Sequence, residues 1–375
     1  IEDLYVVVEP GVTHKDLNAE LKKYGFFIPG PSSGNVANIG GMVATNASGG
    51  NAVKYGATRD YVLGMEVVFP KGDIAKLGSR TLKNSAGYQL EKLMCGMEGT
   101  LGIITEITLR IAPLPEATAV AVAVFDTLEK AGQCVANMIA RPLIPSGLEL
   151  MSRVCIEAVN KAVCMGLPDE EAILLIEVDG SANDVKDQIR KVMEVCKSSG
   201  ALSVDFTDHP ERKEELWKGR KAMIPALSKY DDDLVTVMLA DDMAVPMSKV
   251  PEAVTAFQEI SDKYDIVIAS YGHSGDGNLH TKVLMDPTKR SHWDQAEKAV
   301  EEIYSKVMDL GGTITGEHGV GMTKAPFFLR ERKCSLDAMR TIKMALDPNN
   351  IMNPNKIMDW EDNFISRLRY HLEEE

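Results

Sequence analysis

Residues 271–280 have the sequence Tyr-Gly-His-Ser-Gly-Asp-Gly-Asn-Leu-His. The runs on either side, 265–269 and 279–285, are rich in apolar residues and predict two buried strands. The Gly-Asp-Gly between them predicts a tight hairpin or a strand-loop-strand corner. Such a corner can bring His273 and His280 together, with both imidazoles projecting into one cavity.

A second loop, residues 315–321, has the sequence Thr-Gly-Glu-His-Gly-Val-Gly. Its glycines allow the backbone that carries Glu317 and His318 to press against another surface. Two histidines and one carboxylate, here His273, His280 and Glu317, form a standard ligand set for a catalytic divalent metal with one open position. His318 is then left beside the metal, placed as a general base.

The distribution of histidines favours this interpretation. The chain has 7 histidines, and three of them fall in these two glycine-rich loops. The alternative is that His273 and His280 are capping or core residues and that Glu317 is a solvated acid. For one histidine alone this alternative is the better one, but the grouping of three makes a metal site the preferred hypothesis.

Arg220 is a candidate for binding an anionic substrate. It ends the sequence Trp-Lys-Gly-Arg within a predicted helix that begins near Glu211. The planar guanidinium of arginine suits bidentate binding of a carboxylate. A surface arginine paired with the many acids of that helix is an equally good interpretation of the sequence.

Glycine-rich loops are frequent in the first third of the chain, at residues 30–34, 39–41 and 47–51. Backbone this rich in glycine can approach a bulky ligand closely and donate N–H groups to it. Residues 98–105 form a glycine-spaced turn running into an apolar strand, which could lie against a planar ring. Taken one at a time, these loops and the turn around Asn353 are better explained as ordinary turns.

The length of 375 residues predicts two domains with large buried cores. Patterning predicts helices at 127–140, 182–199 and 335–345 and a strand at 172–178. Strands mixed with long helices predict an α+β or α/β arrangement in which helices pack on a sheet, and we expect the class α+β with an α/β cap domain.

Composition excludes several classes of partner. The formal charge of −14 disfavours nucleic acid. The six cysteines occur singly, which indicates reduced thiols and leaves no ligand set for an iron-sulfur cluster. The longest strongly apolar run, 117–125, is far shorter than the roughly 18 residues of a membrane span. We therefore expect a cytoplasmic protein that is peripheral to a membrane only through a partner.

The order of these motifs resembles the vanillyl-alcohol oxidase type of flavoprotein, in the branch of glycolate oxidase large subunits, D-lactate dehydrogenases and D-2-hydroxyglutarate dehydrogenases. The two histidine-containing loops are specific to this branch. The resemblance rests on residues 8–11, 31–33, 39–41, 46–47, 54–56, 98–102, 273–280, 316–319 and 353–354.

The resemblance implies FAD as cofactor and assigns roles to individual residues. It gives His273, His280 and Glu317 as ligands of a divalent metal (zinc, iron or manganese). His318 would be the general base, and Arg220 would orient the substrate carboxylate. Lys282 is a candidate for a further polar group near the substrate. The residues implied to contact FAD are Pro31, Ser32, Gly40, Gly41, Asn46, Glu98, Gly102, Ile103 and Asn353.

The same resemblance implies a domain plan. It predicts an FAD-binding domain at 1–113, a cap domain with an antiparallel sheet and the metal site at 114–330, and a C-terminal helical segment at 331–375 that returns to the FAD-binding domain. Family members begin with a further pyrophosphate-binding segment, which is absent here. We therefore expect that a missing segment or a companion chain completes the FAD site.

The implied activity is metal-assisted oxidation of a small D-2-hydroxy acid, such as lactate or glycolate, to the 2-keto acid. Electrons would pass to an iron-sulfur subunit, an electron-transfer flavoprotein or a quinone. Two alternatives remain open at this point. One is a metal-dependent hydrolase, because the same histidines and glutamate also suit activation of water. The other is a non-catalytic assembly subunit with the fold of a flavoprotein.

Overall fold

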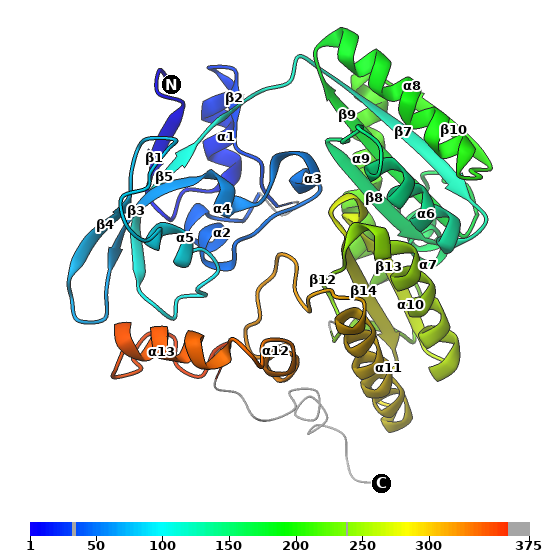
Figure 1. Ribbon diagram of the computed structural model, residues 1–375. Helices are drawn as coiled ribbons and strands as arrows, with labels where there is room; N and C mark the ends of the chain where they lie inside the picture. Colours follow the sequence, from blue (N-terminus) through cyan, green and yellow to red (C-terminus); the bar gives the residue numbers. More distant parts are fainter. Residues whose placement is uncertain (32–34, 238, 359–375) are drawn as a thin grey trace. The chain divides into compact units, whose positions relative to one another are not determined.

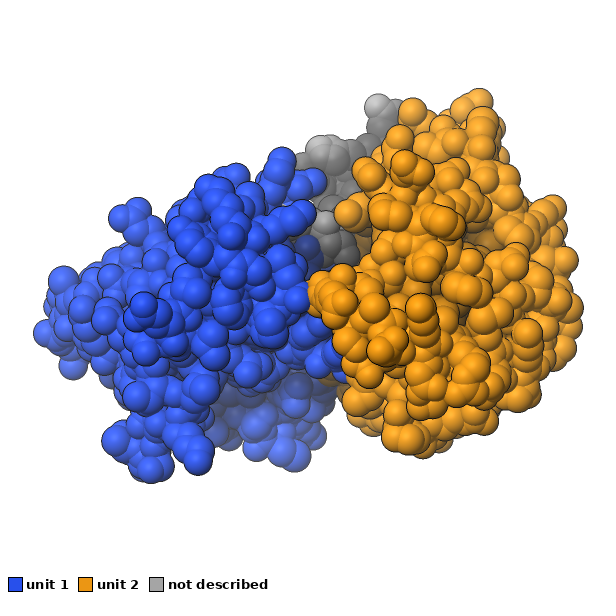
Figure 2. Space-filling model, turned by 90° about the horizontal axis from the view of Figure 1, so that it is seen from above, with its two compact units in different colours: residues 1–114, 317–363 blue, residues 115–316, 364–375 orange. Residues whose placement is uncertain are grey.

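The computed structural model describes residues 1–31, 35–237 and 239–358 (Figure 1). The chain forms two units, coloured separately in Figure 2. Among the described residues, unit 1 comprises 1–114 and 317–358, and unit 2 comprises 115–316. Residues 317–330, expected in the cap domain, belong to unit 1 by their contacts.

Unit 1 is built on an antiparallel sheet with the strand order β1-β5-β3-β4, and a separate antiparallel pair joins β2 to β6. Its strands are β1 (Tyr5–Val8), β2 (Phe26–Phe27), β3 (Val62–Val68), β4 (Ile74–Gly78), β5 (Ile103–Arg110) and β6 (Ala112–Pro113). Its helices are α1 (His14–Lys22), α2 (Ile39–Thr45), α3 (Ala52–Tyr55), α4 (Thr58–Tyr61), α5 (Leu90–Leu93), α12 (Ala325–Glu331) and α13 (Leu336–Leu346).

The core of unit 1 forms where two short helices meet the sheet. Leu17 and Leu21 of α1 and Ile39 and Val43 of α2 recur at a spacing of four residues, which puts each pair on one helical face. These faces are buried in one cluster with Ile107 of β5. The first unit therefore has its own hydrophobic core, as a separate domain requires.

Unit 2 contains a larger antiparallel sheet with the order β10-β7-β9-β8-β13-β14-β11, in which β12 also pairs with β14. Its strands are β7 (Ala117–Phe125), β8 (Gly147–Ser152), β9 (Ala172–Gly180), β10 (Ser203–Thr207), β11 (Val235–Val237), β12 (Met243–Ala244), β13 (Val267–Gly272) and β14 (Asn278–Met285). Its helical segments are α6 (Leu128–Ile139), α7 (Arg153–Val163), α8 (Ala182–Ser198), α9 (Pro210–Leu227), η1 (Met247–Lys249), α10 (Val250–Tyr264), η2 (Ser274–Asp276) and α11 (Arg290–Asp309).

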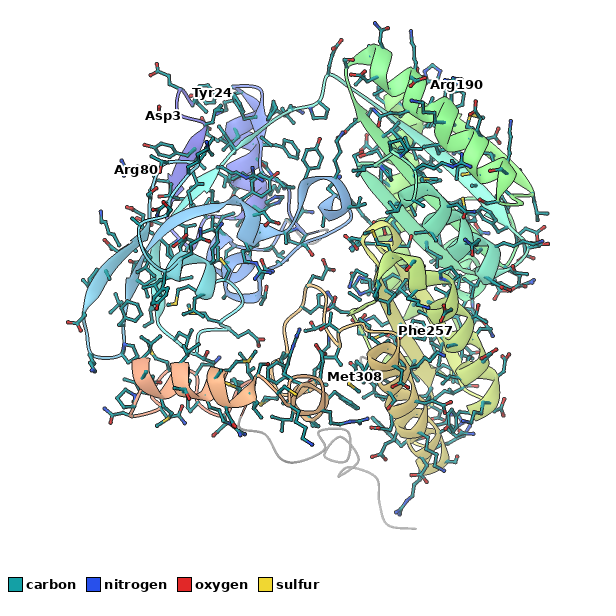
Figure 3. All side chains as sticks on the ribbon, viewed as in Figure 1. Asp3, Tyr24, Arg80, Arg190, Phe257 and Met308 are labelled. Carbon is teal, nitrogen blue, oxygen red and sulfur yellow. The ribbon has the colours of Figure 1, made fainter. Side chains whose placement is uncertain are left out.

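Helices cover both faces of this sheet. α7 and α9 pack together and share one core cluster with residues of β7, β8, β9, β13 and β14. That cluster contains no residue of α6, α8, α10 or α11, which contact one another on the opposite side. Phe257 of α10 is 1% exposed, whereas the Arg190 side chain of α8 is 61% exposed (Figure 3). β8 and β14 are therefore buried along their whole length, and β9 is buried at seven of its nine positions.

The elements expected from the sequence are present within three residues of the expected bounds. The helices at 127–140 and 182–199 begin where sequence chemistry predicts, because Thr127 accepts a hydrogen bond from the N–H of Lys130 and Ser181 accepts one from Asp184. The Gly-Asp-Gly corner is η2, between β13 and β14. No helix of the described residues is long and apolar enough to cross a membrane.

Candidate active site

The histidine pair comes from the hairpin formed by β13 and β14. Tyr271 is the register partner of His280, and the two rings stack with centroids 5.1 Å apart. Gly272 precedes His273 with φ +152°, and a Cβ there would lie 2.4 Å from the carbonyl oxygen of Asn278. The backbone of β14 therefore lies too close to Gly272 for a residue with a side chain at that position. The chain then turns, and His273 lies beside His280 with ring centroids 5.5 Å apart.

His273 is held by Glu149, a residue of β8. Both side chains are at least 95% buried, and Nδ1 of His273 lies 2.5 Å from Oε1 of Glu149. The other carboxylate oxygen, Oε2, accepts a hydrogen bond from Nε of Arg220 (2.9 Å) and forms an ion pair with one of its Nη atoms (2.8 Å), which reach it from α9. Arg220 also lies over the Tyr271 ring, 5.2 Å from its centroid. One buried carboxylate thus joins a histidine to an arginine.

The protonation of this group follows from its surroundings. Burial opposes ionisation of Glu149, but the charges and hydrogen bonds of His273 and Arg220 outweigh it and hold the pKa of Glu149 at about 2. An ionised carboxylate can only accept hydrogen bonds, so Nδ1 of His273 must be the donor. In the neutral form of the ring, which a metal ligand requires, the lone pair is then on Nε2.

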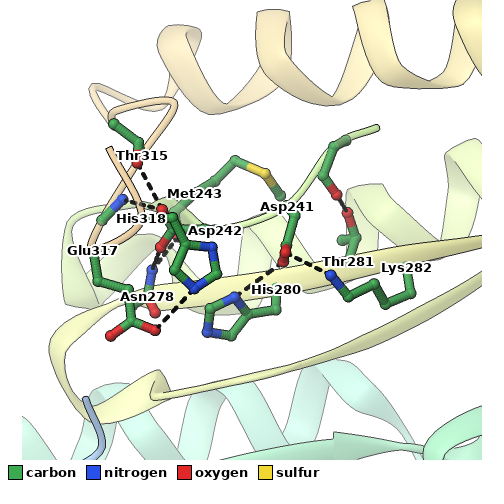
Figure 4. Close-up of polar contacts among 12 residues, drawn as sticks. Asp241, Asp242, Met243, Asn278, His280, Thr281, Lys282, Thr315, Glu317 and His318 are labelled. Atoms are coloured by element: carbon green, nitrogen blue, oxygen red, sulfur yellow. Dashed lines mark hydrogen bonds and ion pairs between the residues drawn. The ribbon is translucent and has the colours of Figure 1, made fainter. Parts of the chain in front are cut away.

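His280 repeats this arrangement with a different carboxylate. Its Nδ1 lies 3.0 Å from Oδ1 of Asp241, and Lys282 donates from Nζ to Oδ2 at 2.5 Å (Figure 4). Burial raises the pKa of Asp241, yet His280 and Lys282 together bring it below its usual range. Both histidines are therefore oriented by an acidic partner on Nδ1, which is the common second layer of a metal site.

Asp242 fixes the loop that leads to Glu317. It is fully buried and has φ +63°, a conformation uncommon outside glycine. Its carboxylate accepts hydrogen bonds from Nδ2 of Asn278 (2.9 Å), the hydroxyl of Thr315 (2.6 Å) and the N–H of Gly316 (3.1 Å) (Figure 4). Glu317 and His318 follow directly, with the His318 Nε2 3.5 Å from the Glu317 carboxylate.

The donor set here fits a divalent metal. Ligand atoms of Asp242, His280, Glu317 and His318 all lie within 4.8 Å of one another. Imidazole nitrogen and carboxylate oxygen are the donors that zinc, iron and manganese share. In addition, Oδ1 of Asn278 is buried with no hydrogen-bond partner among the described residues. His273 is outside this group of four, and His318, expected to be the base, is inside it.

The residues expected to contact FAD lie in unit 1, around the ends of α2 and β5. Gly40 and Gly41 are in the first turn of α2, where a Cβ on Gly40 would lie 2.5 Å from Cβ of Pro10. Asn46 ends that helix with φ +53° and accepts the N–H of Arg59 at 2.9 Å. These positions therefore have structural roles of their own.

A second group of the expected FAD contacts surrounds the turn before β5. Glu98 and Asn353 both have positive φ, +48° and +40°, and Nδ2 of Asn353 donates to the carbonyl of Glu98 at 2.6 Å. Gly102 lies against Val67, and a Cβ there would be 2.7 Å from that side chain. Ile103 begins β5 and is 57% exposed. An exposed apolar residue beside strained, close-packed backbone fits a surface that a planar cofactor covers.

Two further expected contacts lie near residue 32. Pro31 is a partly buried loop residue. Ser32 lies outside the described residues.

The acidic partners were not identified from the sequence. Glu149 is the one charged residue in the apolar run of β8, and Asp241 and Asp242 are adjacent acids at the end of another apolar run. An acid that interrupts a buried strand needs a partner, so the sequence does indicate that these acids are paired. The sequence does not indicate which residue each acid pairs with, because Glu149 and His273 are 124 residues apart.

Comparisons with protein families match both parts of the chain. The model for the C-terminal domain of FAD linked oxidases matches residues 114–357, and an FAD binding domain model matches residues 1–78.

Among curated proteins, the glycolate oxidase subunit GlcD of Bacillus subtilis is 39% identical over 359 residues, covering 95% of this chain and 76% of that protein. The mitochondrial D-lactate dehydrogenase [cytochrome] of Arabidopsis thaliana is 37% identical over 363 residues, covering 96% of this chain and 63% of that protein. The chain thus spans about three quarters of the first relative and less than two thirds of the second.

Solved structures show the same fold at low sequence identity. p-Cresol methylhydroxylase has a TM-score of 0.72 and 16% identity, covering 96% of this chain and 77% of that chain. Alkyldihydroxyacetonephosphate synthase has a TM-score of 0.68 and 18% identity, covering 95% of this chain and 64% of that chain.

Proposed function

Because this chain belongs to the FAD-linked oxidases, we propose that it oxidises a D-2-hydroxy acid, with lactate and glycolate as the first candidates, to the 2-keto acid. Two relatives named for glycolate oxidase and D-lactate dehydrogenase, at 39% and 37% identity, support this substrate class. The observation that carries the proposal is the buried group of Arg220, Glu149 and His273, which joins a carboxylate-binding residue to a candidate metal ligand.

Arg220 is proposed to bind the substrate carboxylate. Its Nε and one Nη already donate to Glu149, so one edge of the guanidinium is committed. The end of the fork, formed by the two terminal nitrogens, still offers N–H groups in a bidentate arrangement. Glu149 therefore fixes the direction from which the substrate carboxylate can approach.

His273, His280 and Glu317 are proposed to hold a divalent metal. When bound, this ion supplies Lewis-acid chemistry that lowers the pKa of an alcohol, and FAD supplies the two-electron acceptor. Glu149 and Asp241 keep the Nε2 lone pairs of the two histidines available. His318, whose side chain is 46% exposed, is proposed to take the hydroxyl proton of the substrate.

An electron-accepting partner completes the proposal. All six cysteines are free, and the one adjacent pair printed among them, Cys134 and Cys196 with sulfurs 3.7 Å apart, is too small a set of thiolates for an iron-sulfur cluster. We propose an iron-sulfur subunit or an electron-transfer flavoprotein, which the name "glycolate oxidase subunit" of a relative supports. In the same assembly, a companion chain or a further segment is proposed to complete the FAD site. Free thiols throughout also favour the reducing environment of the cytoplasm.

The test of the reaction is the absorption spectrum of the FAD-loaded protein under anaerobic conditions, before and after adding D-lactate or the achiral acid glycolate. Bleaching of the flavin band by D-lactate and not by L-lactate is the expected result. A flavin band that no hydroxy acid bleaches contradicts the proposed substrate class. A protein that binds metal but never flavin would instead support a hydrolase.

The ligand and base assignments are tested by metal analysis of His273→Ala, His280→Ala and His318→Ala. We expect the first two variants to lose metal and the third to keep it while turnover falls by about 100-fold or more. The grouping of His318 with Asp242 and His280 makes this contrast informative. If His318→Ala lost the metal while His273→Ala kept it, His318 would be a metal ligand and His273 would not.

A further inference from the structure

Glu98 occupies an unusual backbone position in unit 1. Its φ of +48° is in the left-handed region, which costs free energy for a residue other than glycine or asparagine. Its N–H donates to the carbonyl of Ala44 at 2.8 Å, which ties the turn to the last residues of α2. Strain of this kind persists only where surrounding contacts fix the residue.

The carboxylate of Glu98 binds the backbone of a segment more than two hundred residues away. The N–H of Val320 donates to Oε1 at 2.7 Å across 222 residues, and the N–H of Gly321 donates to Oε2 at 2.8 Å. Consecutive amides that point at one anion form a nest, an arrangement that usually holds a phosphate or a carboxylate ligand. Here the anion is a side chain of the same chain.

Gly319 brings this segment close to the carboxylate. It has φ +84°, and a Cβ at this position would lie 2.9 Å from Cδ of Glu98. The approach is therefore available to glycine alone. From the other direction, the carbonyl of Glu98 accepts a hydrogen bond from Asn353 at 2.6 Å. The N–H of Ile357 also donates to the carbonyl of Gly321 at 3.1 Å.

We propose that Glu98 is a positioning residue, whose carboxylate holds residues 319–321 and thereby fixes the backbone that presents Glu317 and His318. The inference rests on the roles proposed above for these two residues. Val320 is only two residues beyond His318, so fixing its amide restricts the directions available to the imidazole. Glu98 then acts on the reaction through this loop, in place of the side-chain contact with FAD implied by the family resemblance.

The chemistry of the pair determines the best variants. Glu98→Gln keeps the shape and one acceptor oxygen, but its NH2 group faces a backbone N–H, so one of the two hydrogen bonds is lost. Gly319→Ala leaves Glu98 intact and displaces the loop from the other side. Glu20→Gln is the matched control, because Glu20 belongs to unit 1 and its side chain is 56% exposed on α1.

The first measurement is amide hydrogen exchange in the FAD-loaded protein, resolved to the peptide that contains Val320 and Gly321. We expect exchange there to become about tenfold faster or more in Glu98→Gln and Gly319→Ala, since hydrogen bonds to a charged group are lost or lengthened. Exchange should be unchanged in Glu20→Gln. Unchanged exchange in both test variants overturns the inference, whatever the enzyme's substrate proves to be.

The second measurement separates positioning from cofactor binding and from general instability. With the substrate that reduces the wild type, we expect kcat to fall by roughly 10- to 100-fold, the cost of a misplaced catalytic group, while KM and flavin content stay near their wild-type values. Loss of flavin from Glu98→Gln with normal exchange at Val320 contradicts the inference and restores a direct contact with FAD. If no hydroxy acid reduces the wild type, the proposed function fails while the exchange result stands.

Discussion

At the scale of single residues, the buried Glu149 and the partly buried Glu177, on neighbouring strands of unit 2, have pKa values shifted in opposite directions. Glu149 of β8 and Glu177 of β9 both face α9, which presents Arg220 to the first and Trp217 to the second. Arg220 is a cation and Trp217 is only a neutral hydrogen-bond donor. The same substitution should therefore have opposite effects at the two positions.

For Glu149→Gln we expect a loss of about 3 kcal/mol or more in the free energy of unfolding, because a buried guanidinium loses its counter-charge. In the enzyme, KM for the hydroxy acid should rise, since Arg220 is no longer held at the angle that Glu149 sets. Urea denaturation and steady-state kinetics measure the two effects. A variant with wild-type stability and wild-type KM would contradict the role of this buried group.

For Glu177→Gln we expect a gain in stability at pH 7. Burial raises the pKa of Glu177, and the hydrogen bonds from Trp217 and Ser146 oppose this only in part. A raised folded-state pKa means that stability is lost as the pH rises from the ordinary value of 4.5 through the folded pKa. The gain from glutamine should therefore be complete at pH 7 and vanish below about pH 4. Thermal melts of both proteins across this pH range test the sign.

Sequence reasoning found the histidines but not the carboxylates that orient them, and the reason is the distance along the chain. His273 and His280 belong to one hairpin, so a turn motif is enough to bring them together. Asp241 lies 39 residues before His280 in the sequence, on a different strand connection, and no local pattern indicates this pairing. Pairings of this kind depend on strand order, which single-sequence patterns do not contain.

At the scale of secondary-structure elements, the helices on one face of the large sheet approach each other closely at Gly132 of α6. This residue is buried, and a Cβ there would lie 2.8 Å from Cα of Pro251 in α10. The sequence predicted a helix at 127–140, where α6 is observed, but its partner helix could not be predicted. Small residues on a helix permit close packing in many orientations.

For Gly132→Ala the two relevant effects have opposite signs. Helix propensity alone predicts a gain of about 1 kcal/mol for alanine over glycine. The contact with the backbone of Pro251 predicts a loss of roughly 1–3 kcal/mol from overpacking, and we expect the loss to dominate. Urea denaturation measures the net effect, with the exposed neighbour Gln133→Ala as control. A stabilised Gly132→Ala variant would show that α6 and α10 can move apart at little cost.

At the scale of the whole molecule, the reactivity of the cysteine thiols measures how well both units bury their side chains. Cys164 and Cys334 are exposed, whereas the other four cysteines are buried. Burial raises the pKa of Cys95 and of Cys155 to about 11, so both remain neutral thiols at pH 8. We expect iodoacetamide at pH 8 to modify Cys164 and Cys334 in the native protein and all six cysteines in guanidinium. Mass spectrometry of peptides reads the pattern, and rapid labelling of Cys155 would contradict the packing of unit 2.

The hydrogen bonds between Glu98 and residues 320–321 also have a consequence for biosynthesis. At a translation rate of about 5–20 residues per second, the 222 residues between Glu98 and Val320 take roughly 10–45 s to emerge from the ribosome. Residues 115–316 are continuous and can fold during this interval, whereas residues 1–114 still lack their contacts with the segment that follows residue 316. We therefore expect residues 1–114 to need chaperone protection until that segment has been synthesised.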